Sequence, residues 1–102
     1  MVNFIRDQLP DEELLAQLAE EATELAHAAL KMRRAMDGRN PTPVPASEAW
    51  EKLQEEVADV LLSLQVLSIE TNDQEYRETI RQKLERWVYR LQQAERGEDL
   101  NY

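Results

Sequence analysis

Two short acidic segments carry the side chains in this sequence that are best suited to chemistry. The segment "EEATEL" spans residues 20–25, and the segment "EEVAD" spans residues 55–59. Each contains two acids three positions apart, and on a helix such a pair places its Cβ atoms about 5–6 Å from each other. Carboxylate oxygens at that separation are suited to sharing one hard cation such as Mg²⁺, or to holding adjacent ones. Each segment therefore offers one part of a metal site.

The same segments can also be interpreted as acidic faces that are simply solvated. The chain has 21 acidic residues among 102, so three acids at a fixed spacing arise about once by chance in a chain of this length. The chain has no cysteine, and its single histidine, His27, cannot form an imidazole cluster. We expect His27 on the surface, opposite the carboxylates of its helix. Oxygen ligands are the option that remains for a metal, and spacing alone leaves both interpretations open.

Charge and hydropathy limit the partners. The net charge of −9 argues against binding to nucleic acid or to anionic membranes and favours cations. The first residues, "MVNFIRDQLP", lack the long apolar stretch of a signal peptide. No run of about 20 apolar residues is present to span a bilayer. We therefore expect a soluble, cytoplasmic protein.

Helices are the elements predicted to position these acids. Proline and glycine, the main helix breakers, are confined to Pro10, residues 38–45 and Gly97. The sequence therefore predicts an all-α protein. Its expected organisation is a single domain over residues 1–102, with a core at about 11–92, a proline-rich loop at 38–46 and a mobile tail at 97–102.

Three helices are expected in this core. The first runs from about Asp11 to Met36 and is ended by Gly38. The second begins after Ser47, a natural N-cap, and ends before the segment "ETND". The third begins at a capping box formed by Asn72 and Glu75, and it frays near Gly97.

Each predicted helix carries one apolar stripe at alternating steps of three and four residues, and we expect these stripes to be the packing faces. Both tryptophans lie on stripes, so we expect them in the core, and stacking on a base is the alternative role. The stripes are Leu15, Leu18, Ala22, Leu25, Ala29, Met32 and Met36 in the first helix, Trp50, Leu53, Val57, Val60, Leu61, Leu64 and Leu67 in the second, and Tyr76, Ile80, Leu84, Trp87, Val88 and Leu91 in the third.

The direction of each acid follows from the turn of about 100° per residue. Glu21 lies about 65° and Glu24 about 125° from the stripe of the first helix. Glu56 lies about 80° and Asp59 about 140° from the stripe of the second helix, in the same rotational sense. Glu20, about 165° from the stripe, is expected to face water. If the two helices pack antiparallel, as a loop of about ten residues favours, these four carboxylates converge beside the contact between the helices.

Basic residues lie where they would complement such a cluster. Lys52 precedes Glu56 by one turn, and Lys83, Arg86 and Arg90 share one flank of the third helix. Metal ions together with lysine and arginine are what a polyphosphate ligand needs. For the three residues of the third helix a simpler role is also open, because cations near a helix C-terminus interact favourably with its dipole and with glutamates one turn away.

With both clusters identified, the sequence resembles a known family. The segments "LAEEATELAHAALKMRRA", "AWEKLQEEVADVLLSLQVL" and "RQKLERW" are together similar to short stand-alone members of the MazG-like all-α nucleoside triphosphate pyrophosphohydrolases, over about residues 11–92. The two acidic segments look like the paired EExxE and ExxD motifs of that family. The separation of the two motifs is at the long end of the usual range because of the "GRNPTPVP" loop.

The resemblance implies an antiparallel bundle of three main helices, completed by dimerisation into a homodimer or a dimer of dimers. It implies cleavage between the α- and β-phosphates of a nucleoside triphosphate, giving a monophosphate and pyrophosphate, in the control of nucleotide pools. The implied cofactor is Mg²⁺, with Mn²⁺ as a substitute. The implied metal ligands are Glu21, Glu24, Glu56 and Asp59, with Glu24 as the candidate base. The candidate phosphate-binding residues are Lys52, Lys83, Arg86 and Arg90.

Two alternatives remain open at this point. Phosphoribosyl-ATP pyrophosphohydrolases and dimeric dUTPases resemble this family and use similar acidic motifs, so the substrate is not fixed. A non-catalytic helical interaction module, with solvated acidic flanks and stripes that bind another helix, is the alternative from a different class.

Overall fold

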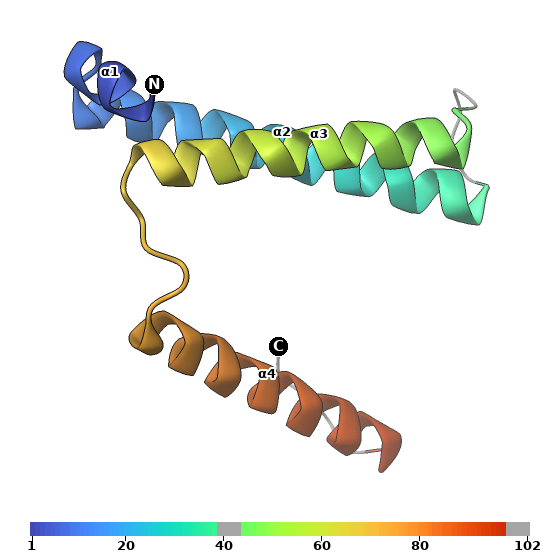
Figure 1. Cartoon of the computed structure of the whole chain (residues 1–102). Coiled ribbons are helices and arrows are strands. Elements are labelled where there is room, and N and C mark those ends of the chain that lie inside the picture. The colour runs from blue at the N-terminus through green and yellow to red at the C-terminus, as the bar shows by residue number, and fades with distance from the viewer. Residues whose placement is uncertain (39–43, 98–102) are drawn as a thin grey trace. The chain divides into compact units, whose positions relative to one another are not determined.

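The computed structural model describes residues 1–38 and 44–97. Within these residues the chain forms helices α1 (Val2–Gln8), α2 (Asp11–Asp37), α3 (Ala46–Val66) and α4 (Gln74–Glu95), and no strand (Figure 1). The all-α prediction is therefore confirmed. Most of the predicted loop at 38–46 and of the predicted tail at 97–102 lies outside the described residues. The chain divides into two compact units, Met1–Ile69 and Glu70–Tyr102, and each is described by itself.

Helix α2 begins at Asp11 as predicted and ends at Asp37, one residue beyond the predicted end. Its first turn carries Asp11, Glu12 and Glu13, whose charges favour the positive end of the helix dipole. At the other end Gly38 adopts the left-handed conformation, with φ of 75°, and donates its backbone N–H to the carbonyl of Arg34. Glycine has no Cβ to oppose this conformation, so it ends the helix at low cost.

The predicted N-caps of the next two helices are wrong by one or two positions. Helix α3 has Pro45 as its N-cap rather than Ser47, and the Pro45 carbonyl accepts the N–H groups of Glu48 and Ala49. The ring of proline fixes φ near the helical value, which lets the helix begin before the serine. Helix α4 is capped by Asp73, whose carboxylate accepts the Tyr76 N–H at 2.7 Å, instead of by its neighbour Asn72.

Helix α3 also ends at Val66, earlier than its apolar pattern suggests. Ser68 adopts a positive φ of 61°, and the Ile69 N–H reaches back to the Leu64 carbonyl at 3.0 Å. The Ser68 N–H bonds the Gln65 carbonyl at 3.0 Å in the same turn. These paired bonds form a Schellman motif, which satisfies carbonyls at the end of the helix without a glycine.

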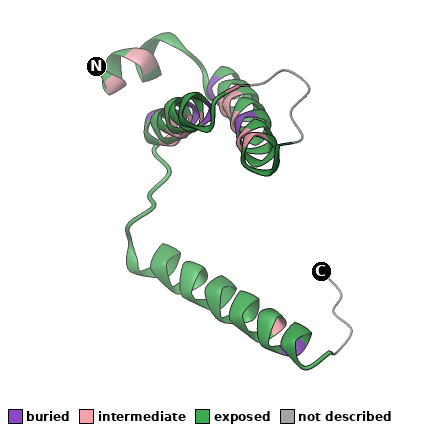
Figure 2. Ribbon diagram, turned by 90° about the vertical axis from the view of Figure 1, so that its right-hand side faces the viewer, coloured by how far each residue is buried: buried purple, intermediate pink, exposed green. Residues whose placement is uncertain are grey.

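Helices α2 and α3 pack side by side and run in opposite directions (Figure 1). This arrangement confirms the antiparallel prediction for these two helices. Both helices carry buried residues, which are purple in Figure 2, and some of these are apolar. The buried apolar residues are Leu14, Ala28, Ala49 and Val66, each 5–6% exposed. Ala28 and Ala49 line one cavity together with Lys31 and Lys52.

The faces in contact overlap the predicted stripes but are rotated from them towards the acids. The stripe residues Leu18, Leu25 and Met32 of α2 are half-buried. Glu56 and Ser63 are buried in α3, whereas Trp50 and Leu61 of the predicted stripe are each 52% exposed. On α2 the stripe residues Leu15 and Met36 are likewise exposed. When only two helices pack, each covers a narrow part of the other's surface. Here the covered surface lies between the apolar stripe and the acids. The expectation that Trp50 lies in the core is therefore wrong for this chain.

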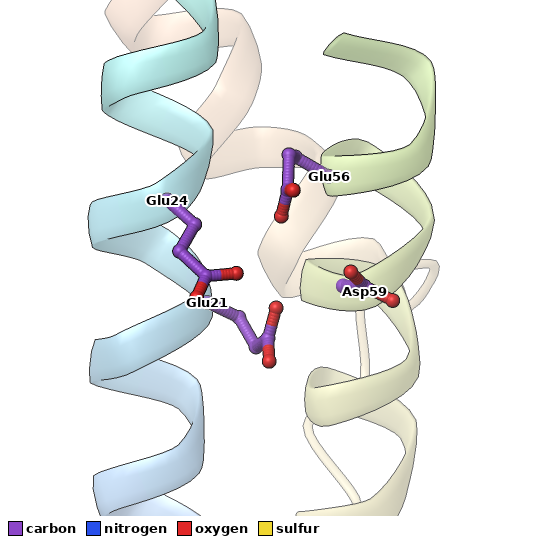
Figure 3. Close-up of side chains that lie close together, drawn as sticks. All are labelled: Glu21, Glu24, Glu56 and Asp59. Atoms are coloured by element: carbon purple, nitrogen blue, oxygen red, sulfur yellow. The ribbon is translucent and has the colours of Figure 1, made fainter. Parts of the chain in front are cut away.

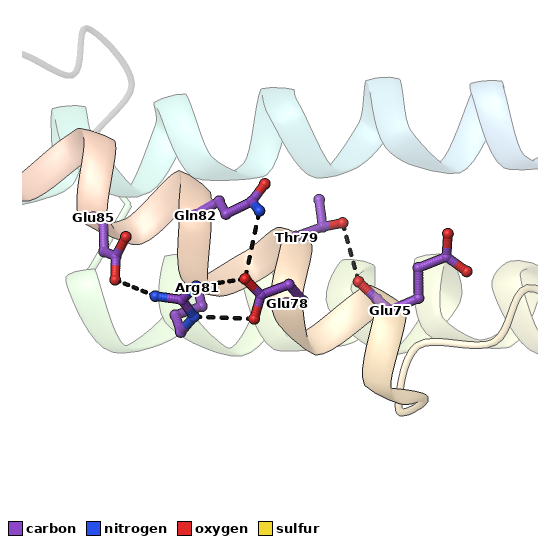
Figure 4. A network of polar contacts seen from close by, with 6 residues as sticks. All are labelled: Glu75, Glu78, Thr79, Arg81, Gln82 and Glu85. Carbon is purple, nitrogen blue, oxygen red and sulfur yellow. Dashed lines mark hydrogen bonds and ion pairs between the residues drawn. The ribbon is translucent and has the colours of Figure 1, made fainter.

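Helix α4 forms most of the second unit. Its surface carries a polar network in which Arg81 bonds both Glu78 and Glu85, one turn before and after it (Figure 4). Bonding and charge from Arg81 lower the pKa of Glu78. Within the second unit nothing covers the apolar stripe of α4, and Trp87 is 62% exposed there. The core position expected for Trp87 stays a prediction.

Candidate metal centre

Four carboxylates converge between α2 and α3, as Figure 3 shows. Glu21 and Glu24 come from α2, and Glu56 and Asp59 come from α3. Each residue offers an oxygen, and all four oxygens lie within 4.8 Å of one another. The spacing of three within each helix stacks the two acids of a pair one above the other, and the antiparallel packing brings the pairs face to face. The exposed Glu20 is not part of the group.

Glu56 lies at the buried side of this cluster, with only 3% of its surface exposed. Its Oε1 atom accepts the Lys52 ammonium at 2.9 Å, one turn away on the same helix. Its Oε2 atom is buried and has no hydrogen-bond partner among the described residues, and the same is true of Oε2 of Glu21. A buried oxygen without a partner is costly, and a cation bound by both residues would remove that cost.

The environment of the cluster shifts the pKa of Glu21. Burial raises the pKa of its carboxyl, and the negative charges of Glu24, Asp59 and Glu56 raise that pKa further. The side-chain amide of Gln17 opposes this shift by donating a hydrogen bond to Oε1 of Glu21 at 2.7 Å. The amide therefore fixes one oxygen of Glu21 and leaves the other for a ligand. Because like charges oppose ionisation here, a cation would stabilise the ionised cluster.

Lys52, one of the predicted basic residues, contacts Glu56 of this cluster. The hydrogen bond and the charge of Glu56 raise its pKa, with smaller contributions from Glu55 and Glu24. Its ammonium also lies 3.7 Å from the exposed carboxylate of Glu55. The pair formed with Glu56 neutralises one of the four negative charges and leaves the cluster strongly acidic.

A polar cavity of about 290 Å³ opens beside Glu24 and Glu56. Lys31, Lys52 and His27 line it as well. The expectation that His27 lies opposite the carboxylates is therefore wrong, although the residue is exposed as expected. Sequence reasoning did not single out Lys31. The sequence feature that could have identified Lys31 is its position seven residues after Glu24, because that spacing puts both side chains on the same face of α2.

On the other side, Glu21 and Asp59 line a cavity of about 320 Å³ whose remaining walls are mostly apolar. Gln17 and Ser63 line this cavity too, and neither was predicted as a site residue. Both residues lie one helical turn from an acid of the cluster, because Gln17 precedes Glu21 by four positions and Ser63 follows Asp59 by four. The cluster is thus flanked by one cavity with lysines and one with apolar walls.

The three predicted basic residues of α4 also lie together. Lys83, Arg86 and Arg90 line a cavity of about 430 Å³ with Trp87, within the second unit. Their role as phosphate-binding residues stays a prediction.

The donor set fits Mg²⁺. This ion is bound by carboxylate oxygens, usually together with substrate phosphates and water, and the cluster offers four carboxylates of which two are exposed. When bound in such a site, Mg²⁺ supplies positive charge to phosphate oxygens and makes water a stronger nucleophile.

Comparison with known proteins agrees with this chemistry. The family model described as MazG nucleotide pyrophosphohydrolase domain matches residues 10–93, which include α2, α3 and nearly all of α4. No curated protein and no solved structure matches the chain. None of the described helices is long and apolar enough to cross a membrane.

Proposed function

Because the chain belongs to the MazG nucleotide pyrophosphohydrolase family, we propose that it hydrolyses a nucleoside triphosphate to the monophosphate and pyrophosphate, using Mg²⁺ held by Glu21, Glu24, Glu56 and Asp59. The observation that carries this proposal is the convergence of these four side chains, two of which also have a buried oxygen without a hydrogen-bond partner. A merely solvated acidic face would leave its oxygens to water and bury none of them.

The residues of the cluster differ in accessibility, and this suggests different roles. Glu56 is buried and Glu21 half-buried, which suits ligands that hold a cation in a fixed position. Glu24 and Asp59 are exposed, so they remain in contact with solvent water. Glu24 is our candidate for the general base, because it is an exposed carboxylate that also lines the polar cavity.

The proposed reaction is a substitution at the α-phosphorus. A water oxygen forms a bond to the α-phosphorus, and the bond from that phosphorus to the α–β bridging oxygen breaks. The bridging oxygen leaves with pyrophosphate, and the proton of the attacking water passes to Glu24. Lys52, whose ammonium lies beside the cluster, offsets charge on the phosphate oxygens.

The exposed apolar residues support assembly with a second copy of the chain. Leu15, Met36, Trp50 and Leu61 are between 52% and 74% exposed. Their helical positions put them on the flank of the α2–α3 pair away from the carboxylates. A chain of this size gains stability by covering such a surface. We propose a homodimer or a dimer of dimers, which light scattering coupled to size-exclusion chromatography would measure.

The substrate itself is tested by a panel. Purified protein is incubated with each NTP, each dNTP and phosphoribosyl-ATP, with Mg²⁺ or with EDTA, and pyrophosphate is measured. We expect metal-dependent release from at least one nucleoside triphosphate. Release from phosphoribosyl-ATP alone, or from dUTP alone, would assign the chain to the corresponding relative. Release from none would favour the non-catalytic helical module.

A further inference from the structure

Lys52 bonds the most buried carboxylate of the cluster, and a cation at the cluster would draw on the same negative charge. The Lys52 ammonium lies 2.9 Å from Oε1 of Glu56, a side chain that is only 4% exposed. A carboxylate that coordinates Mg²⁺ shares its charge with the ion and attracts an ammonium group less. Two positive charges beside one buried carboxylate also repel each other, with little water between them to screen the repulsion. Binding of Mg²⁺ by Glu56 therefore weakens its attraction for Lys52.

The lysine can leave Glu56 without any change in the helix. Its side chain is 60% exposed, and its flexible four-carbon stem can rotate in solvent. A second acceptor lies close by, because the ammonium is 3.7 Å from the carboxylate of Glu55, which is 70% exposed. Release therefore costs less than it would for a buried lysine, since water and Glu55 can take over the solvation of the charge.

Lys52 also borders the space into which it would be released. It lines two cavities, and both have Ala28 and Lys31 on their walls as well. The cavity of about 290 Å³ includes Glu24 and Glu56, whereas the cavity of about 370 Å³ extends along the first turns of α3. An ammonium released into this space stays beside the cluster, where it can bind phosphate oxygens.

We propose that Lys52 is an exchangeable counterion of the metal site, which pairs with Glu56 until Mg²⁺ binds and then uses its released ammonium to bind the phosphates of the substrate. The proposal rests on the proposed function, because it takes Glu56 as a metal ligand. It adds an order to the two binding events, since the metal frees the cation that the phosphate chain needs. Lys52 thereby couples metal binding to substrate binding.

Lys52→Met tests the exchange, because methionine has a similar length and no charge. Calorimetry on the full chain measures Mg²⁺ affinity without nucleotide, in mildly alkaline buffer that keeps the carboxyl groups ionised. We expect Lys52→Met to bind Mg²⁺ about tenfold more tightly, because the ion no longer displaces a hydrogen-bonded charge. Pyrophosphate, added at saturating Mg²⁺, should bind about tenfold more weakly, because the released ammonium is missing. A merely structural role of Lys52 would weaken both ligands.

Lys31→Met is the matched control, because Lys31 lines the same polar cavity and carries the same charge. Among the described residues no ion pair joins Lys31 to a carboxylate of the cluster. Its removal should change Mg²⁺ affinity by less than about twofold, since an exposed charge is largely screened by water. Lys52→Arg keeps a cation that can bond Glu56, so it should not gain Mg²⁺ affinity. Circular dichroism checks that each variant keeps its helices.

Nuclear magnetic resonance follows the exchange in the wild type, so the test does not depend on a variant that folds. The chain has three lysines, Lys31, Lys52 and Lys83, so their side-chain signals form a simple spectrum. The Lys52 signal, assigned by through-bond correlation to the backbone, should move towards that of a solvated lysine as Mg²⁺ is added. The Lys31 signal should move less, because Lys31 loses no ion pair with the cluster.

Unchanged or weaker Mg²⁺ affinity in Lys52→Met would overturn the exchange and leave the metal site itself in place. An equal gain in Lys31→Met would also overturn it, because a general effect of charge would then explain the result, and so would an equal gain in Lys52→Arg. A Lys52 signal that stays in place at saturating Mg²⁺ would show that the ion pair persists. Unchanged pyrophosphate affinity in Lys52→Met would overturn the contact with phosphate. A wild type that binds no Mg²⁺ would reject the proposed function as well.

Discussion

Replacing Glu56 by glutamine gives two opposite effects that can be read in one thermal denaturation experiment. In the metal-free protein this side chain is 3% exposed and keeps one oxygen without a partner. An unsatisfied buried group costs about 1–3 kcal/mol. Glutamine retains an acceptor for Lys52 and turns an NH₂ group towards the neighbouring carboxylates. Metal-free Glu56→Gln should therefore be as stable as the wild type, or more stable by up to about that amount.

With Mg²⁺ bound, the wild type should become more stable than Glu56→Gln. At a concentration of ten times the dissociation constant, a bound ion stabilises the wild type by about 1.4 kcal/mol, which raises Tm by about 6–11 °C in a domain of this size. Loss of one ligand weakens binding by at least about ten- to a hundredfold, so the gain at the same concentration falls to about 0.4 kcal/mol or less. The expected increase in Tm for the variant is then at most about 3 °C.

Glu55→Gln is the matched control for this experiment. It makes the same substitution at the adjacent position of α3, and Glu55 also contacts Lys52, at 3.7 Å. Its side chain is 70% exposed and lies outside the cluster. The control should keep the full response to Mg²⁺. A full Mg²⁺ response in Glu56→Gln, or an equal loss in both variants, would refute the assignment of Glu56 as a ligand.

Three more predictions follow from particular contacts. Gln17→Leu removes the hydrogen bond that orients Glu21, so Mg²⁺ affinity measured by calorimetry should fall about ten- to a hundredfold; unchanged affinity would contradict the positioning role. Arg6→Ala removes two charge-assisted hydrogen bonds to the end of α3. Its free energy of unfolding, measured in urea, should be about 1–3 kcal/mol lower than that of the wild type, and Arg6→Lys should lie between the two. Equal stability of the wild type and both variants would argue against the contact. In α4, the pKa of Glu78 is lowered from its ordinary value of 4.5 by Arg81, so the folded state favours the carboxylate. The pair should therefore stabilise the helix above pH 4.5, and this contribution should disappear as pH falls through the lowered pKa. Arg81→Gln should move the carboxyl titration of Glu78, followed by NMR, back towards higher pH, and an unmoved titration would show that the pair does not form in solution.

The convergence of the carboxylates could be predicted because it depends only on local rules. The bearing of each acid follows from helix periodicity, and the antiparallel packing of α2 and α3 follows from the short connection between them. The calculation needed no side-chain detail. Gly38 likewise ends α2 as predicted, since no other nearby residue adopts a left-handed conformation as easily.

Other features depend on competition between neighbours or on distant contacts. Asn72 and Asp73 are both good N-cap residues, and a helix can begin after Pro45 as well as after Ser47. Sequence preference therefore does not choose within either pair. Helix α1 has only seven residues, too few for a periodic pattern, and its anchor reaches α3 some sixty positions away. The same long-range contact creates the apolar cavity, which is why no motif marks it.

The rotation of the packing face has a similar origin. Periodicity finds the most apolar side of each helix, whereas the observed contact also includes part of the acidic flank. Ala28 and Ala49 are both buried at this contact, and Glu56 is buried with them. Predicting this would have required weighing residue size against hydrophobicity for two helices together.

Hydrolysis in ¹⁸O-labelled water, followed by mass spectrometry of both products, tests the central claim most directly. The wild type with Mg²⁺ and a nucleoside triphosphate should give a monophosphate that carries the label and pyrophosphate that does not, because water attacks the α-phosphorus. Glu55→Gln should do the same, and Glu56→Gln should give neither product. Label in pyrophosphate, release of orthophosphate with a diphosphate, or no cleavage of any nucleotide by the wild type would contradict the account.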